Sequence, residues 1–191
     1  MRKGEKAITL CMPITGKCKA ESEGEEDGVF VRFVFKPHWF VLTQTDGEPI
    51  EAPTVPEWNR EQALAALGIQ EIAFDLTNGN VMGFAREQSI AINPVNPLPH
   101  KTTFHELAHC LLHTAEGAFA DSEHTPRNLR EVEAESVALL CCESLGLPGS
   151  EFSRGYIQGW LAGDVIPEKS AQKIFRAADQ ILRAGQQIEA E

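Results

Sequence analysis

The segment from Thr102 to His113 constrains the fold and chemistry of the chain most strongly, because it reads TTFHELAHCLLH. On an α-helix, His105 and His109 lie one turn apart on the same face. Two ring nitrogens in this arrangement can bind one metal ion at the ~2.0–2.1 Å that zinc requires. Glu106 lies about 100° further round the helix, too far to ligate easily but well placed to hold a water on the metal. The segment therefore predicts a zinc site.

The rest of this helix is apolar, which predicts that the helix is buried and that its polar triplet faces a site in the core. The apolar residues are Phe104, Leu107, Ala108, Leu111 and Leu112. A random chain of this length and composition would contain the His-Glu-x-x-His pattern roughly 0.03 times, even with Asp allowed for Glu. Chance is therefore a poor explanation of the motif.

A second, acidic helix offers the third metal ligand. Zinc sites that carry out hydrolysis keep three protein ligands and leave one position for water. In residues 129–140, Glu131 and Glu135 share one helix face, whereas Glu133 lies about 200° away from Glu131 and is expected to face solvent. One carboxylate of the shared face can bind the metal while the other orients a histidine through its second ring nitrogen. We assign Glu131 to the metal and Glu135 to the histidine, and the reverse assignment is the alternative.

These residues predict hydrolysis of a peptide bond. Zinc would lower the pKa of its water toward about 7 and polarise the carbonyl of a peptide or protein substrate. Glu106, as the catalytic base, would take the proton of the water and pass it to the leaving nitrogen. Tyr156 is a candidate donor to the oxyanion, with a core or interface role as its alternative. His113 and His124 are weaker candidates for the metal, since His113 lies near the helix end and His124 in a loop.

The two motifs together resemble a known family. The run His105–His109 followed by Glu131–Glu135 is similar to the Glu-zincin metallopeptidases, in which the first Glu of a Glu-x-x-x-acid pair binds zinc. More closely, the chain resembles the C-terminal metallopeptidase-like domain of ArdC-type antirestriction proteins of mobile elements. Residues 156–161 and 174–178 are similar to the closing helices of that family. The resemblance implies a zincin-like fold and an antirestriction context, and it favours Glu131 as the third ligand.

The same resemblance gives a domain division. Residues 2–8 and 41–47 look like the end of the N-terminal single-strand DNA-binding domain of the ArdC family. We therefore expect residues 1–46 to be a β-rich remnant of that domain and residues 57–191 to be the zincin-like metallopeptidase domain. The resemblance implies that most of the family's N-terminal domain is missing upstream of Met1, so we expect contacts with single-stranded DNA to be weak.

The fold class expected from the whole pattern is α+β, with a twisted, mainly antiparallel sheet packed on the HExxH helix. An acidic turn at 21–28 should join two strands of the N-terminal module, and Asn78–Asn80 should form a hairpin turn. One of three later strands should line the cleft and pair with an extended peptide. The expected strands are 7–14, 29–36, 71–76, 81–85 and 89–93, and the further helices are 57–67, 151–162 and 167–188.

Charge and composition bear on partners and location. The net charge of -11 opposes tight binding to phosphate, and no apolar run approaches the ~20 residues of a membrane span. The N-terminus lacks the apolar stretch of a signal peptide, so a cytoplasmic location without a membrane partner is expected. The rival to a peptidase is an antirestriction protein that acts by binding, through single-strand DNA contacts or as an acidic decoy, with a structural or vestigial metal site.

Overall fold

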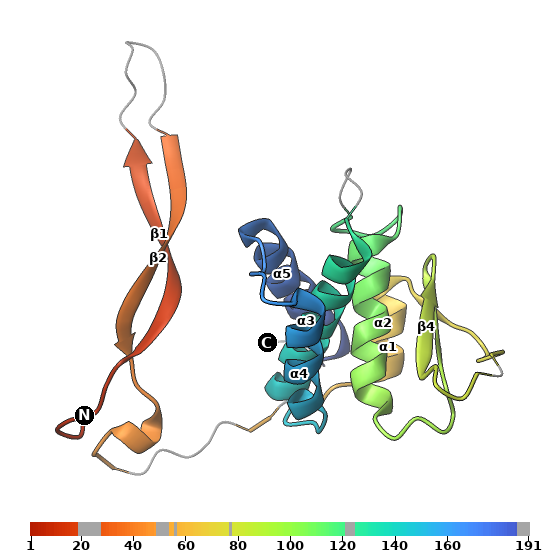
Figure 1. Ribbon diagram of the computed structural model, residues 1–191, viewed down its shortest axis with the longest axis horizontal. Coiled ribbons are helices and arrows are strands. Elements are labelled where there is room, and N and C mark those ends of the chain that lie inside the picture. The colour runs from red at the N-terminus through yellow and green to blue at the C-terminus, as the bar shows by residue number, and fades with distance from the viewer. Residues whose placement is uncertain (19–27, 49–53, 56, 77, 121–124, 187–191) are drawn as a thin grey trace, which may run out of the picture. The chain divides into compact units, whose positions relative to one another are not determined.

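The computed structural model of the protein describes residues 1–18, 28–48, 54–55, 57–76, 78–120 and 125–186. The chain divides into two compact units, Met1–Pro53 and Thr54–Glu191. Figure 1 shows a two-stranded ribbon in the first unit, and helices with a small sheet in the second. The α+β fold class predicted from the sequence is therefore confirmed.

The first unit is built on one long antiparallel ribbon. Strand β1, Ile8–Cys18, pairs with β2, Gly28–Trp39, and a short 3-10 helix, η1, follows at Leu42–Gln44. Both predicted strands are confirmed and are longer than expected. The side chain of Phe35 is 77% exposed, because two strands alone cannot enclose a core. The acidic residues 19–27 lie outside the described part of the chain.

Five helices make up most of the described part of the second unit, and short local signals set their ends. Helix α1 begins at Arg60, three residues later than predicted, because the Asn59 side chain accepts a hydrogen bond from the Gln62 amide at 2.8 Å. It ends where Gly68 adopts a φ of 67°. The helices are α1 (Arg60–Leu67), α2 (Pro99–His113), α3 (Arg127–Ser144), α4 (Ser150–Leu161) and α5 (Glu168–Gly185).

Among the described residues of the second unit, the sheet has three short strands in the order β3-β5-β4. Strand β3 is Gln70–Glu71, β4 is Gly83–Arg86 and β5 is Ser89–Ile92, with β3 parallel and β4 antiparallel to β5. The predicted strand 71–76 is wrong beyond Glu71. The predicted hairpin at Asn78–Asn80 is also wrong, because the buried strand β5 lies between β3 and β4.

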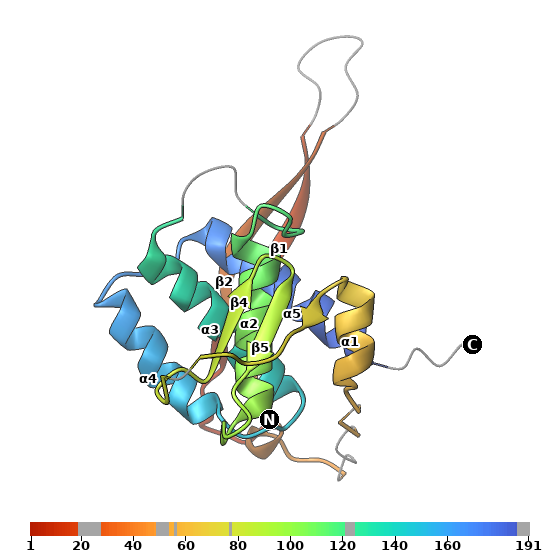
Figure 2. The same cartoon turned by 90° about the vertical axis from the view of Figure 1, so that its right-hand side faces the viewer.

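Helix α2 is the centre of the second unit. Strands β4 and β5 contact this helix and overlie it in Figure 2, and α3 also packs against it. Figure 1 shows that β4 and α3 lie on opposite sides of α2. Phe104 and Leu107 of α2 are fully buried, and the Phe104 ring meets Trp58 edge-on at 4.8 Å between centroids. Because α2 has neighbours on both sides, its imidazoles lie at a junction of elements rather than on a free surface. In the described part of the chain, no helix combines the length and apolar character needed to cross a membrane.

Candidate metal centre

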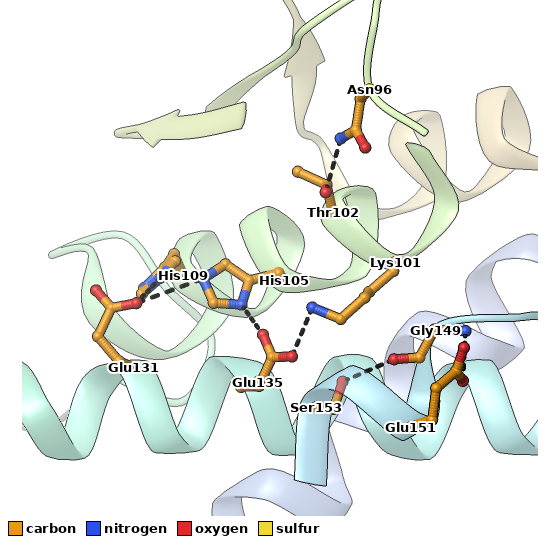
Figure 3. A network of polar contacts seen from close by, with 10 residues as sticks. All are labelled: Asn96, Lys101, Thr102, His105, His109, Glu131, Glu135, Gly149, Glu151 and Ser153. Carbon is orange, nitrogen blue, oxygen red and sulfur yellow. Dashed lines mark hydrogen bonds and ion pairs between the residues drawn. The ribbon is translucent and has the colours of Figure 1, made fainter. Parts of the chain in front are cut away.

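Three side chains from two helices converge in the second unit. His105 and His109 extend from α2, and Glu131 faces them from α3 (Figure 3). The two Nε2 atoms lie 3.1 Å apart, and the Glu131 Oε2 lies 3.6 Å from that of His105 and 3.9 Å from that of His109. A point at equal distance from three atoms so spaced lies about 2.1 Å from each, which is the length of a zinc bond to imidazole or carboxylate. Three ligand atoms of a tetrahedral zinc lie about 3.4 Å apart, so these donors are spaced closely enough to hold a divalent ion.

The second ring nitrogen of His105, Nδ1, faces Glu135. The Glu135 Oε2 lies 3.0 Å from His105 Nδ1, and its other oxygen lies 2.5 Å from Lys101 Nζ. Burial would raise the pKa of Glu135, but His105, Lys101 and Ser153 together lower the pKa to about 2. The structure thus places Glu131 beside the Nε2 atoms and Glu135, as an ionised acceptor, behind His105.

The second ring nitrogen of His109, Nδ1, faces another histidine, His113. His109 Nδ1 lies 2.9 Å from His113 Nδ1, and His113 Nε2 lies 2.7 Å from Glu133 Oε2. The prediction that Glu133 faces solvent is wrong, since this residue is fully buried. Helix α5 packs on that side of α3 and supplies Lys173, whose Nζ lies 3.2 Å from Glu133 Oε1. The i,i+4 spacing of His109 and His113 was the only local signal of this arrangement.

Glu106 is buried next to the metal ligands and close to strand β4. Burial raises the pKa of Glu106 to about 7, while His105 lowers the pKa and Glu131 raises it. A Cβ atom at Gly83 would lie 3.2 Å from the Glu106 Oε1 and 2.6 Å from the Cγ2 of Thr102. Only a residue without a side chain fits here, so the β4 backbone passes directly beside the carboxylate.

A cavity of about 810 Å³ opens onto these residues. Its lining comes from residues 80–85, which include most of β4, and from α2, α3 and α4. Strand β4 ends the sheet, so among the three candidate strands it is the one placed at both an edge and the cavity. Tyr156 of α4 also lines the cavity and is 51% exposed, so it is not a core residue. Its role as an oxyanion donor stays a prediction.

The protonation of the two imidazoles gives a testable pH dependence. Burial by itself would lower the pKa of His105, but the facing carboxylates of Glu131 and Glu135 raise the pKa to about 9. Burial, together with His105 and His113, lowers the pKa of His109 to about 3. A metal ion needs both rings neutral, so its uptake must release the proton of His105. We expect the apparent affinity to rise about 10-fold per pH unit from pH 7 to 8.5.

Chelator competition at three pH values measures this slope, and calorimetry in two buffers of different ionisation enthalpy counts the released proton. In Glu135→Gln the slope should flatten, because the variant removes one of the carboxylates that raise the pKa of His105. An affinity independent of pH in the wild type would contradict the expectation.

No protein-family model matches the sequence, and no curated protein matches it. Among solved structures, the chain is similar to the antirestriction protein ArdC from plasmid R388, whose crystal structure is Mn(II)-bound. The TM-score is 0.50 and the identity is 19%, over 96% of this chain and 73% of that one. At this identity the likeness concerns the fold, and at that level it agrees with the ArdC-type resemblance of the sequence.

Proposed function

We propose that this chain is a divalent-metal protein with an antirestriction role, and that its metal centre hydrolyses a peptide bond in a protein target. The arrangement of Glu106 beside the converging donors of His105, His109 and Glu131 carries the hydrolytic part. The likeness to an antirestriction protein with bound Mn(II) supports the first part.

Each residue of the site has a separate role in the proposed hydrolysis. His105, His109 and Glu131 hold the ion, which when bound lowers the pKa of water and polarises a carbonyl. Glu106 accepts the proton of the attacking water and delivers it to the leaving nitrogen, a task suited to a carboxyl with a pKa near neutrality. The Tyr156 hydroxyl is the candidate donor to the oxyanion from the α4 side of the cavity.

The substrate proposed for this site is an extended peptide. Strand β4 has β5 on one side, and its other edge carries backbone groups that can pair with a peptide segment. Because Gly83 has no side chain, a peptide bond lying along this strand could approach Glu106 closely. A zincin-like fold is part of this proposal.

Zinc is the ion we propose. Two imidazoles favour zinc among the common divalent ions, whereas the carboxylate suits manganese as well. The Mn(II) in the ArdC structure makes manganese the specific competitor to test in metal analyses.

The second candidate function is antirestriction by binding, and the ArdC likeness supports it more directly than it supports hydrolysis. Single-strand DNA contacts would fall to the first unit, but a net charge of -11 opposes them. An acidic decoy would need contiguous carboxylates, whereas the densest acidic run is the short stretch 21–27, which lies outside the described residues.

One paired experiment separates the two functions. If proteolysis is the mechanism, Glu106→Gln will lose restriction protection, and wild-type protein will bind single-stranded DNA weakly, with little change as salt rises. The measurements are a restriction-protection assay of both proteins and a DNA titration at low and moderate salt. Protection that survives in Glu106→Gln, together with submicromolar and steeply salt-dependent DNA binding, would defeat the peptidase and establish the binding function.

A further inference from the structure

We propose that Glu133 and His113 form a relay that fixes the tautomer of His109, so that its Nε2 lone pair faces the metal. Both would act as positioning residues through His109. This inference rests on the metal centre of the proposed function. It assigns a role to two buried groups that the hydrolytic scheme leaves unused.

The relay is short at every step, and it is buried at its Glu133 end. The Glu133 Oε2 lies 2.7 Å from His113 Nε2, and His113 Nδ1 lies 2.9 Å from His109 Nδ1. The side chain of Glu133 is fully buried and that of His113 is 4% exposed. Lys173 of α5 lies 3.2 Å from the second Glu133 oxygen, and this cation balances the buried negative charge. Water therefore has little access to the contacts of Glu133.

The direction of both hydrogen bonds in the relay follows from the Glu133 carboxylate. One Glu133 oxygen lies 3.2 Å from the Lys173 ammonium and the other lies 2.7 Å from His113 Nε2, so the carboxylate is paired with a cation and accepts from the imidazole. His113 must then donate from Nε2, and in a neutral imidazole its Nδ1 becomes an acceptor. His109 must in turn donate from Nδ1, which leaves the lone pair of its Nε2 directed toward Glu131 and His105.

The two metal histidines thereby obtain the same tautomer by different routes. Glu135 accepts directly from the Nδ1 of His105, whereas Glu133 acts on His109 through an intervening imidazole. Each carboxylate is held by a lysine, Lys101 for Glu135 and Lys173 for Glu133. Losing a partner of this kind costs a metal site about 10–100-fold in affinity.

The test combines metal affinity with the tautomer of His109 in the metal-free protein. His113→Phe removes the acceptor and keeps a ring, while His113→Gln restores an acceptor oxygen. The matched control is His100→Phe, at an exposed histidine in the first turn of the same helix. Ring 15N NMR near pH 10, above the pKa of about 9 of His105, reports which nitrogen of His109 carries the proton when the mostly neutral His105 ring no longer has a second proton to donate to His109 Nε2. Competition with a chelator measures the affinity for Zn²⁺.

We expect wild-type His109 to be protonated on Nδ1 and His113→Phe to lose this preference together with about 10–100-fold in zinc affinity. His113→Gln should recover most of both, and His100→Phe should match the wild type. A wild-type His109 with its proton on Nε2, or unchanged affinity in His113→Phe, overturns the relay while the metal centre stands. Absence of zinc binding in every protein refutes the proposed function instead. The wild-type tautomer needs neither a variant nor metal, so it decides the relay even then.

Discussion

After gentle purification, His105→Ala is expected to contain far less bound zinc than the wild-type protein. The variant removes one of three donors that lie within 4.8 Å of one another, and the remaining two cannot fill the coordination of a catalytic zinc. Elemental analysis of both proteins, purified in parallel, measures the loss. Equal, substoichiometric zinc in the two would show that the ion binds elsewhere or not at all.

The same measurement decides between the two glutamates of α3. Glu131→Ala should behave as the loss of a ligand, whereas Glu135→Ala should cost only the ~10–100-fold typical of a residue that orients one. Glu143→Gln is the matched control, since this glutamate lies on the same helix, is half exposed and pairs with Arg154. If Glu135→Ala loses more metal than Glu131→Ala, the alternative ligand assignment is correct.

Glu106→Gln is expected to keep the metal and the fold and to lose at least ~100-fold in peptide hydrolysis. The amide is close in size to the carboxylate, so it fits beside Gly83, but it cannot accept the proton of a water. Digestion of a peptide library by both proteins, with and without a chelator, measures the effect. Glu116→Gln, at an exposed glutamate beyond the end of α2, is the control. Cleavage that survives both Glu106→Gln and chelation would come from another site or a contaminant.

The sequence predicted those parts of the site that depend on helical spacing. His105 and His109 face one point because they are four residues apart on one helix, and Glu131 and Glu135 share a face for the same reason. The prediction that Glu133 faces solvent is wrong because the burial of Glu133 depends on Lys173, which comes from a helix about 40 residues later in the chain. Spacing within one helix cannot show which of its faces a distant helix will cover.

The strands were predicted less well for a related reason. The Asn-Gly signal at residues 78–79 is local, and a turn does form there, with the Val81 amide donating to the Asn78 carbonyl at 3.1 Å. Pairing across that turn fails because β5, with Ile90 and Ala91 fully buried, is the better central strand. The actual hairpin joins β4 to β5 through Glu87 and Gln88, where Glu87 adopts a φ of 53° that its residue type does not signal.

With the proposed ion bound, the division of the donors between α2 and α3 would tie the abundance of the protein to the metal supply. An ion held by both helices would act as a cross-link that closes the stretch of chain between His109 and Glu131. Binding to the folded form alone adds about 2.7 kcal/mol of stability when the free ion is at 100 times its dissociation constant. A cell starved of the metal would therefore hold more of the opened chain, which proteases degrade. Turnover would then remove the metal-free protein selectively and leave the loaded form in place.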